Sequence, residues 1–218
     1  MIVDERYTDF INSLESVLSP ELEELYGSSK RDNVPVIRRQ TQSLLRFLMS
    51  MYQPKSILEV GTAVGFSALF MSGFMRSDGH ITTIENYEKR IPQARANFEK
   101  FGQSERITLI EGDAAEVLKT LPDQAYDMIF MDAAKGQYIH FLPQVKRVLQ
   151  NGGLLISDNI LQDGQIIESK FALTRRNRTI HKRMREYLRE LTHSEDFTTT
   201  ILTVGDGVAL SLYNAQQE

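Results

Sequence analysis

The feature that most constrains the fold of this chain is the alternation of short apolar runs with helical patterns between Pro54 and Ser157. The apolar runs have the length of buried strands, and each is followed by polar residues or by apolar residues at helical spacing. The predicted strands are residues 56–60, 80–85, 106–111, 126–131 and 154–157, and the predicted helices are 65–75, 87–101, a short one from 113, and 137–149. Alternation of this kind predicts a parallel sheet with helices on both faces.

The two ends of the chain depart from this alternation. The N-terminal part predicts helices, one opening at Pro20 with Ser19 as its N-cap and another opening at Pro35. Near the other end, residues 197–204 and 208–213 predict two strands joined by a Gly-Asp-Gly turn that starts at Gly205, which is a strong hairpin signal. We therefore predict one α/β domain whose mostly parallel, seven-stranded sheet carries an antiparallel strand in the C-terminal hairpin. The length of 218 residues suits a single domain.

Composition excludes several kinds of site. The chain has no cysteine, which removes disulfides, thiolate metal sites and cysteine nucleophiles, and which fits a reducing cytoplasm. Its start has no basic stretch followed by an apolar one, and no apolar run approaches the roughly 18 residues that span a bilayer. A net charge of −4 argues against a protein that is basic all over. We expect a soluble cytoplasmic protein that does not bind membranes.

The loop after the first predicted strand is typical of a nucleoside-binding turn. Gly61 and Gly65 stand four residues apart, but Ala63 replaces the middle glycine of a dinucleotide fingerprint, so the loop is a poor cradle for a pyrophosphate. Glu85 ends the second strand, where a carboxylate can accept hydrogen bonds from ribose hydroxyls, and Asp113 follows the third strand, where an adenine edge would lie. S-adenosylmethionine is the common cellular molecule that fits. The alternative is that the glycines only make a turn and that Glu85 is a solvated strand end.

Polar residues also end the fourth and fifth predicted strands. Asp132 follows the fourth strand, and Asp158 and Asn159 follow the fifth. The carboxyl ends of parallel strands are where ligands bind in an open sheet, so these side chains meet if the two strands are neighbours. Together with Lys135, one helical turn beyond Asp132, they predict Mg²⁺ or Mn²⁺ held by oxygen ligands beside a base. The alternatives are that the aspartates cap helices, that Asn159 belongs to a turn and that Lys135 is solvated.

These motifs resemble those of the metal-dependent O-methyltransferases related to catechol and caffeoyl-CoA O-methyltransferases, over nearly the whole chain from about Pro35 to Tyr213. Glu59-x-Gly61-x-x-x-Gly65-Phe66-Ser67 resembles the family's cofactor motif, Glu85 its ribose-binding acid, Asp132-x-x-Lys135-x-x-Tyr138 its metal-and-base motif, Asp158-Asn159 its second metal motif, and residues 205–211 its terminal hairpin. Within the family, the chain looks most like the bacterial branch that methylates 5-hydroxyuridine in the tRNA anticodon loop.

The resemblance implies a Rossmann-like class I methyltransferase fold, S-adenosylmethionine as cofactor, and a homodimer for which the N-terminal helices are a plausible interface. It implies cofactor contacts at Glu59, Gly61, Gly65, Ser67, Glu85, Asp113, Ala114 and Asp132, metal ligands at Asp132, Asp158 and Asn159, and Lys135 as the catalytic residue. A catechol offers adjacent hydroxyls to such a metal, and 5-hydroxyuridine offers its 5-hydroxyl and 4-carbonyl. Metal binding lowers the pKa of a hydroxyl, and a lysine of depressed pKa can then take its proton.

A strongly basic segment lies between the fifth strand and the hairpin. Residues 170–190 hold eight basic and two acidic side chains, a net charge of +6 within a chain of −4. Their spacing predicts an amphipathic helix with a basic face outward and an apolar face inward. The basic face consists of Arg178, Lys182, Arg185 and Arg189, and the apolar face of Ile180, Met184, Tyr187 and Leu191. A basic stripe beside an active site is the electrostatic footprint of a phosphate backbone. The RNA contacts are predicted at Arg175, Arg176, Arg178, Lys182, Arg183, Arg185 and Arg189.

We therefore expect an S-adenosylmethionine- and Mg²⁺-dependent O-methyltransferase that converts 5-hydroxyuridine in the tRNA anticodon loop to 5-methoxyuridine. The alternative is the same enzyme acting on a small catechol-like or CoA-ester substrate, with the basic face only solvated or binding a phosphorylated substrate. A nicotinamide-dependent oxidoreductase is disfavoured by the missing middle glycine, and an RNA-binding protein without catalysis by the full set of strand-end ligands. The expected regions are helical N-terminal 1–52, cofactor- and metal-binding core 53–160, basic substrate-recognition insertion 161–195 and C-terminal hairpin 196–214.

Overall fold

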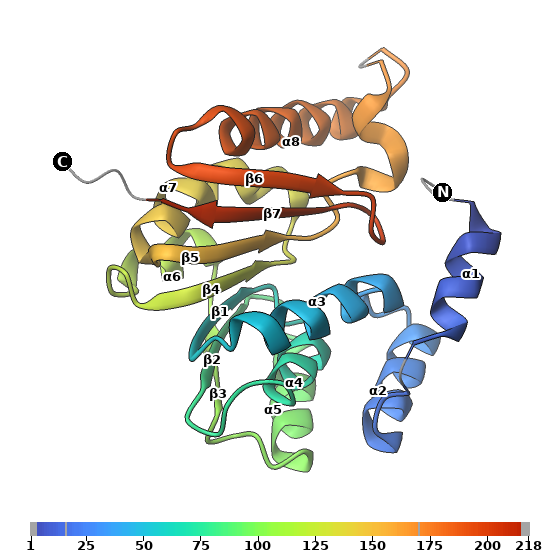
Figure 1. The fold of residues 1–218 in the computed structure, drawn as a ribbon, viewed down its shortest axis with the longest axis vertical. Helices are drawn as coiled ribbons and strands as arrows, with labels where there is room; N and C mark the ends of the chain where they lie inside the picture. The colour runs from blue at the N-terminus through green and yellow to red at the C-terminus, as the bar shows by residue number, and fades with distance from the viewer. Residues whose placement is uncertain (1–3, 16, 170, 215–218) are drawn as a thin grey trace.

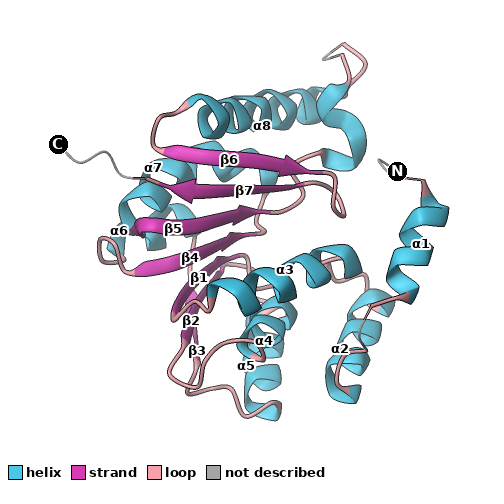
Figure 2. Cartoon of the chain, in the orientation of Figure 1, coloured by secondary structure: helices cyan, strands magenta, loops and turns pink. Residues whose placement is uncertain are grey.

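The computed structural model describes residues 4–15, 17–169 and 171–214, which form a seven-stranded sheet flanked by helices (Figures 1 and 2). The strands run in the order β3-β2-β1-β4-β5-β7-β6, and β7 is antiparallel to both of its neighbours. Their bounds are β1 Ser56–Val60, β2 His80–Glu85, β3 Ile107–Glu111, β4 Tyr126–Met131, β5 Leu149–Ser157, β6 Phe197–Leu202 and β7 Val208–Tyr213. The prediction of a mostly parallel α/β sheet with an antiparallel strand in a C-terminal hairpin is confirmed.

Helices cover both faces of the sheet. Because successive residues of a strand point to opposite faces, Met128 and Phe130 of β4 pack with one layer of helices, and Ile129 and Met131 pack with the other. The first layer consists of α2 Pro20–Arg31, α3 Arg39–Tyr52, α4 Phe66–Ser72 and α5 Ile91–Lys100, and the second of α6 Ala114–Thr120, α7 Tyr138–Val148 and α8 Arg175–His193. The remaining helices are α1 Glu5–Ser13 and the 3-10 helices η1 Lys135–Gln137 and η2 Gln162–Ile167. In the described chain, no helix is long and apolar enough to cross a membrane.

One helix begins later than the sequence suggests. The prediction that a helix opens at Pro35 is wrong, because α3 begins at Arg39 and the residues before it are not helical. This short non-helical stretch buries Val34 and Ile37 and carries Pro35 and Val36 past the carboxyl ends of the central strands. By contrast, α2 starts at Pro20, with the side chain of Ser19 accepting a hydrogen bond from the helix, as the sequence predicts.

Candidate functional site

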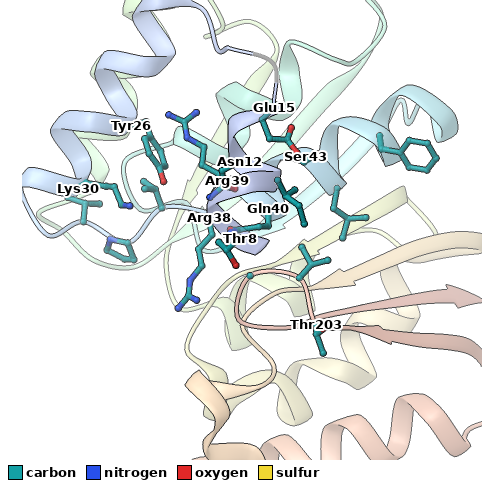
Figure 3. A pocket seen from close by; sticks show the side chains of 18 of the residues that line it. Thr8, Asn12, Glu15, Tyr26, Lys30, Arg38, Arg39, Gln40, Ser43 and Thr203 are labelled. Carbon is teal, nitrogen blue, oxygen red and sulfur yellow. The ribbon is translucent and has the colours of Figure 1, made fainter. Parts of the chain in front are cut away.

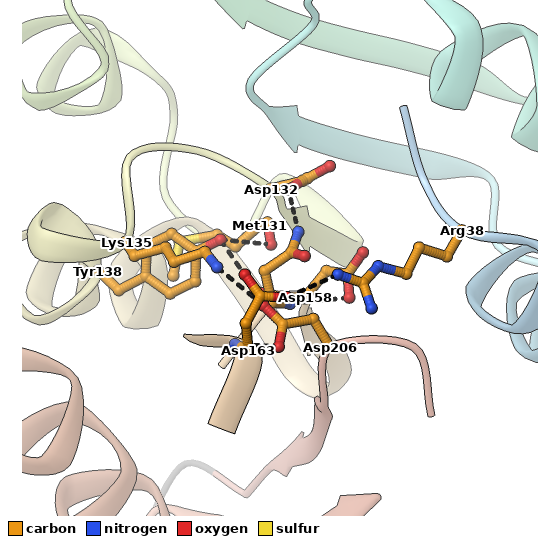
Figure 4. A network of polar contacts seen from close by, with 9 residues as sticks. Arg38, Met131, Asp132, Lys135, Tyr138, Asp158, Asp163 and Asp206 are labelled. Atoms are coloured by element: carbon orange, nitrogen blue, oxygen red, sulfur yellow. Dashed lines mark hydrogen bonds and ion pairs between the residues drawn. The ribbon is translucent and has the colours of Figure 1, made fainter. Parts of the chain in front are cut away.

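The polar residues at the strand ends meet at one edge of the sheet (Figure 4). β4 and β5 are neighbours with Met131 paired to Ser157, so that Asp132 and Asp158 follow their strands at the same level. The backbone N–H of Asp158 donates to the carbonyl oxygen of Met131 at 2.9 Å. Neither aspartate is the N-cap of a described helix, so helix capping does not account for them.

Asn159 connects the two carboxylates. Its backbone N–H donates to Asp158 Oδ1 at 2.8 Å, and its side-chain Nδ2 donates to Asp132 Oδ1 at 2.8 Å. The backbone of Asn159 is left-handed, with φ of 59°, a conformation that asparagine tolerates better than most residues. Rotation of the side-chain amide by half a turn exchanges the positions of its oxygen and nitrogen. Asn159 can therefore offer its oxygen to a cation when one is present.

Burial makes the two carboxylates costly to ionise together. Burial, and after it the charge of Asp132, raises the pKa of Asp158 to about 8. Burial also raises the pKa of Asp132, against the opposing effects of the Asn159 hydrogen bond and the Lys135 charge. A cation shared by the pair would relieve this repulsion, and carboxylate and amide oxygens are ligands that Mg²⁺ accepts. No group of three or more acidic or histidine side chains that could hold a metal occurs in the part of the chain that the structure describes.

Lys135 is the first residue of η1, and its ammonium group has a carboxylate partner. Nζ donates to Asp206 Oδ2 at 2.9 Å, and the Asp206 side chain is 1% exposed. The other carboxylate oxygen, Oδ1, accepts the backbone N–H of Asp163, whose own side chain pairs with Arg38 at 2.8 Å. This network, drawn in Figure 4, joins the residue before α3, the start of η2, the hairpin turn and η1.

A cavity of about 710 Å³ lies above the carboxyl ends of the central strands. It brings together eight of the residues predicted to bind cofactor, metal or the transferred proton: Gly61, Ser67, Glu85, Asp113, Ala114, Asp132, Lys135 and Asn159. Three others, Glu59, Gly65 and Asp158, lie outside its lining. Sequence reasoning did not place the stretch from Pro35 to Ile37, or Asn86, at this cavity. Residues that enter a site from a distant stretch of chain leave no local signal in the sequence.

The glycine loop comes so close to the next strand end that a side chain at Gly61 has no room. Gly61 has φ of +104°, and a Cβ there would lie 2.3 Å from the carbonyl oxygen of Asp132. Gly65, with φ of +84°, is the N-cap of α4 and faces the ring of Phe98 in the same way. Both positions therefore require glycine for conformation and for space.

Glu85 holds the glycine loop in place. Its Oε2 accepts the N–H of Ala63 at 2.8 Å, and its Oε1 accepts the N–H groups of Asn86 and Tyr87. A carboxylate has about four acceptor positions, so about one remains for a ribose hydroxyl. Asp113 is the N-cap of α6 and accepts the N–H of Ala115 at 2.8 Å, which gives it a structural role besides any contact to a ligand.

Glu59 lies beneath the loop instead of in the cavity. Its side chain is fully buried and accepts hydrogen bonds from Ser67 Oγ and Thr83 Oγ1. Burial raises the pKa of Glu59 to about 8, although both hydrogen bonds act to lower it. A Glu59 side chain that supports the loop from below fits this geometry better than direct contact with a cofactor.

The basic segment forms α8, whose apolar face is packed against the rest of the protein. Met184, Tyr187 and Leu191 are fully buried, and Tyr187 OH lies 2.6 Å from Ser157 Oγ at the end of β5. Among the predicted RNA contacts, Arg183 is half-buried, and Arg175, Arg178, Lys182, Arg185 and Arg189 are exposed. Lys170 and the side chain of Arg176 lie outside the described part of the chain.

Three of these arginines also bind the chain itself. Arg178 Nε donates to the Leu173 carbonyl at 2.9 Å, and Arg185 Nη1 to the Ile166 carbonyl at 3.0 Å. Arg183 Nη1 donates to the carbonyl of Gly136 at 3.2 Å, next to Lys135. The basic helix is thereby attached directly to η1, which carries the candidate catalytic lysine.

Two further hollows flank the site. A groove of about 950 Å³ runs between the start of α7 and the basic face of α8. A cavity of about 1100 Å³ lies between α1, α2, α3 and the turn of the C-terminal hairpin (Figure 3). This second cavity shares Pro35 and Val36 with the cavity above the strands, so the two are neighbours.

Comparison with known proteins identifies relatives over nearly the full length. A family model described as O-methyltransferase matches residues 12–213. A catechol O-methyltransferase of Mycobacterium tuberculosis is 28% identical over 200 residues, which cover 88% of each chain.

Solved structures extend this comparison to the fold. A Staphylococcus aureus protein described as a candidate caffeoyl-CoA O-methyltransferase superposes with a TM-score of 0.85 and 32% identity, covering 96% of this chain and 98% of its own. An SAH-bound methyltransferase of Podospora anserina superposes with a TM-score of 0.85 and 26% identity, covering 96% and 94%. The site described above therefore lies in a fold that these relatives share.

Proposed function

The chain belongs to the O-methyltransferase family, and from that premise we propose that it transfers a methyl group from S-adenosylmethionine to the 5-hydroxyl of 5-hydroxyuridine in a tRNA anticodon loop. The family and the SAH-bound methyltransferase of Podospora anserina, which has the same fold, support the methyl donor. One observation supports RNA as the methyl acceptor. The basic helix α8 is attached to η1, which carries Lys135, by the hydrogen bond from Arg183 to the carbonyl of Gly136.

The cavity above the strands suits the methyl donor. Glu85 lines it with a carboxylate that can accept from a ribose hydroxyl, and the loop around Gly61 allows close approach of backbone to ligand. Asp113 and Ala114 line the part of the cavity that follows β3, where an adenine edge would lie. Lys135 and Asp132 line the same cavity, so a donor bound there would lie beside the proton-transfer group.

We propose that Asp132, Asp158 and Asn159 hold a divalent cation, Mg²⁺ or Mn²⁺. Their oxygen atoms are the ligands that such ions prefer, and a buried and a half-buried carboxylate with raised pKa values are better accommodated beside a positive charge. When bound, the cation would supply positive charge that favours the ionised form of an acceptor hydroxyl. Replacing Asp132 or Asp158 by alanine, or adding EDTA, should abolish methyl transfer; activity that persists in all three cases would rule out the cation.

Lys135 is the residue to which we assign proton transfer. In this structure its ammonium donates to Asp206, so the lysine must release a proton to solvent before it can act as a base. The acceptor O–H then gives its proton to Nζ, the oxygen forms a bond to the methyl carbon, and the carbon–sulfur bond breaks with its electron pair left on sulfur. Holding the acceptor and the donor in one cavity supplies much of the rate, because the two reactants no longer have to meet in solution.

The surface beside Lys135 has the charge that an RNA backbone requires. The groove between α7 and α8 is lined by Arg178, Lys182, Arg183, Arg185 and Arg189, with Glu186 as its acidic residue. Such a groove attracts phosphates, and an unpaired base can be recognised in a pocket beside it. The groove and η1, which carries Lys135, meet at the contact between Arg183 and Gly136.

A small catechol-like molecule or a CoA ester is the second candidate acceptor. The curated relative of Mycobacterium tuberculosis is a catechol O-methyltransferase, and the chemistry of the strand-end residues suits adjacent phenolic hydroxyls as well as it suits 5-hydroxyuridine. The basic groove is the observation that favours RNA over a catechol, and it also suits the phosphates of a CoA ester.

The identity of the methyl acceptor is tested by reversing the charge of basic side chains that make no hydrogen bond to the backbone in the described structure. In the test variant, Arg175, Lys182 and Arg189 are replaced by glutamate; they are exposed, and they lie on one face of α8 because they are seven residues apart. In the control variant, the exposed Lys89, Lys100 and Lys119 are replaced instead.

The test variant should lose methylation of a 5-hydroxyuridine-containing anticodon stem-loop by at least about 100-fold while keeping its SAH affinity in calorimetry. The control variant should keep both. If the two variants methylate the stem-loop equally well, the RNA proposal fails. If both methylate catechol efficiently and the stem-loop not at all, the second candidate replaces it.

We also propose that a second copy of the chain covers an apolar surface on the N-terminal helices. Tyr7 and Phe10 of α1 and Phe47 and Met51 of α3 have exposed fractions between 62% and 65%, and the two helices are in contact. Replacing Phe47 by glutamate should convert a dimer into a monomer in light scattering after size exclusion, whereas the same change at the exposed Ile201 of β6 should not. A wild-type chain that is already monomeric would end this proposal.

A further inference from the structure

The hairpin turn contributes a buried carboxylate to the neighbourhood of the catalytic lysine. Asp206 stands between Gly205 and Gly207 in the turn that joins β6 to β7, and its side chain is 1% exposed. It contacts Lys135, which is 71 residues earlier in the chain, at 2.9 Å.

The two oxygens of Asp206 have different partners. Oδ1 accepts the backbone N–H of Asp163 and so fixes the loop that follows Asp158 and Asn159. Oδ2 accepts from the Lys135 ammonium. A backbone N–H could be satisfied by any neutral acceptor, but an ammonium favours a charged one. The choice of aspartate over asparagine at this position is therefore explained by the lysine and not by the loop.

The turn is also held rigidly. The Asp206 carbonyl accepts the N–H of Leu161 at 2.9 Å, and the Gly207 carbonyl accepts the N–H of Ile160 at 3.1 Å. A Cβ at Gly207 would lie 2.2 Å from Leu161, so the turn and the loop are in close contact. The position of Asp206 is therefore set by the backbone, and a flexible lysine side chain bound to it has its position set as well.

We propose that Asp206 is a positioning residue that holds Nζ of Lys135 at the place where it receives the acceptor proton. The proposal rests on the assignment of proton transfer to Lys135. Lysine has four rotatable bonds, and a hydrogen bond from Nζ to Asp206, which the neutral amine can also donate, removes most of the conformations in which Nζ would miss the acceptor. Asp206 itself touches neither substrate nor cofactor in this account.

The test uses Asp206→Asn, which keeps the shape and an oxygen for the Asp163 N–H but turns an amide N–H₂ toward Lys135. We expect kcat for methyl transfer to fall by about 10- to 100-fold, with changes of less than about threefold in KM for the acceptor and in the Kd for SAH. Asp206→Glu should recover less than full activity, because its carboxylate is displaced by one methylene. The acceptor is the stem-loop RNA or catechol, whichever the wild-type enzyme methylates.

A matched control exists on the same hairpin. Asp196, just before β6, accepts from Lys146 at 2.7 Å and forms a second lysine–aspartate pair away from the cavity. Asp196→Asn removes one carboxylate from a lysine pair in the same way. It should leave kcat within about twofold of wild type, and it should destabilise the protein to heat less than Asp206→Asn does, because the Asp196 side chain is 34% exposed and the Asp206 side chain is 1% exposed.

The decisive measurement is a double-mutant cycle with Lys135→Met. If Asp206 acts through Lys135, Asp206→Asn should cause no further loss of kcat in the Lys135→Met background. An equal loss in both backgrounds would show that Asp206 only supports the fold, and would overturn the proposal while leaving Lys135 as the base. Full activity of Lys135→Met alone would overturn the assignment of proton transfer, and the positioning role with it.

Discussion

Replacing Glu59 by glutamine should stabilise the protein at neutral and higher pH, by an amount that grows with pH. Glu59 is fully buried below the glycine loop, and burial raises its pKa from 4.5 to about 8. Between these two pH values the folded chain binds a proton at Glu59 that the unfolded chain has released. At about 1.36 kcal/mol per pKa unit, the cost to folding approaches about 5 kcal/mol above pH 8, which is an order-of-magnitude figure.

The sign follows from the direction of the shift. Because the pKa is raised on folding, the contribution of Glu59 to stability is fully present below pH 4.5 and is lost as the pH rises through about 8. The free energy of unfolding should therefore fall by up to roughly 1.4 kcal/mol per pH unit over that range on account of this residue. Glutamine has no proton to take up, so the variant lacks this part of the pH dependence.

Urea denaturation at pH 5.5, 6.5 and 7.5 measures the effect directly. The difference in unfolding free energy between Glu59→Gln and wild type should become more favourable to the variant by about 1 kcal/mol for each pH unit. Glu88→Gln, a change at an exposed carboxylate, serves as the control and should follow the wild-type curve. Parallel curves for wild type and Glu59→Gln would refute the reasoning, because they would mean that Glu59 is ionised in the folded protein.

Three further changes test other parts of the structure. Gly61→Ala should lower the unfolding free energy by more than about 2 kcal/mol and weaken SAH binding in calorimetry, because its Cβ would lie 2.3 Å from the Asp132 carbonyl oxygen at a φ of +104°. Tyr138→Phe should cost about 1–2 kcal/mol in urea denaturation, because it removes the buried O–H that donates to the carbonyls of Met131 and Asp158; no change would mean that these contacts are not made. The triple charge reversal on α8 should reduce the slope of log K for stem-loop binding against log salt concentration by about two, and an unchanged slope would remove those residues from the RNA contact.

Much of the fold follows from local pattern. The central strands β1 and β4 are buried on both faces, so their sequences are mostly apolar. The polar residues that follow them mark the carboxyl edge of the sheet. The meeting of Asp132 and Asp158 then needs only that β4 and β5 are neighbours, which consecutive strands usually are. The buried face of α8 could also be predicted, since Met184, Tyr187 and Leu191 recur at helical spacing.

The contacts that depend on distant parts of the chain could not be predicted in this way. The sequence shows Asp206 as a turn residue, and its burial against Lys135 arises only when the hairpin folds back along β5. Pro35 gives no sign that its segment passes over the cavity at the carboxyl ends of the central strands. Glu59 belongs to a matching cofactor motif, yet in the structure its carboxylate is satisfied by Ser67 and Thr83 beneath the loop.

The most direct test of the proposed function is mass spectrometry of nucleosides from an anticodon stem-loop that carries 5-hydroxyuridine, after incubation with the full chain, S-adenosylmethionine and Mg²⁺. We expect the wild type to convert 5-hydroxyuridine to 5-methoxyuridine, Asp132→Ala to convert none, and Lys135→Met to convert it at least about 100-fold more slowly. An intact stem-loop together with efficient methylation of catechol in a parallel reaction would contradict the assignment of RNA as the acceptor. Equal conversion by wild type and by both variants would contradict the account of the site itself.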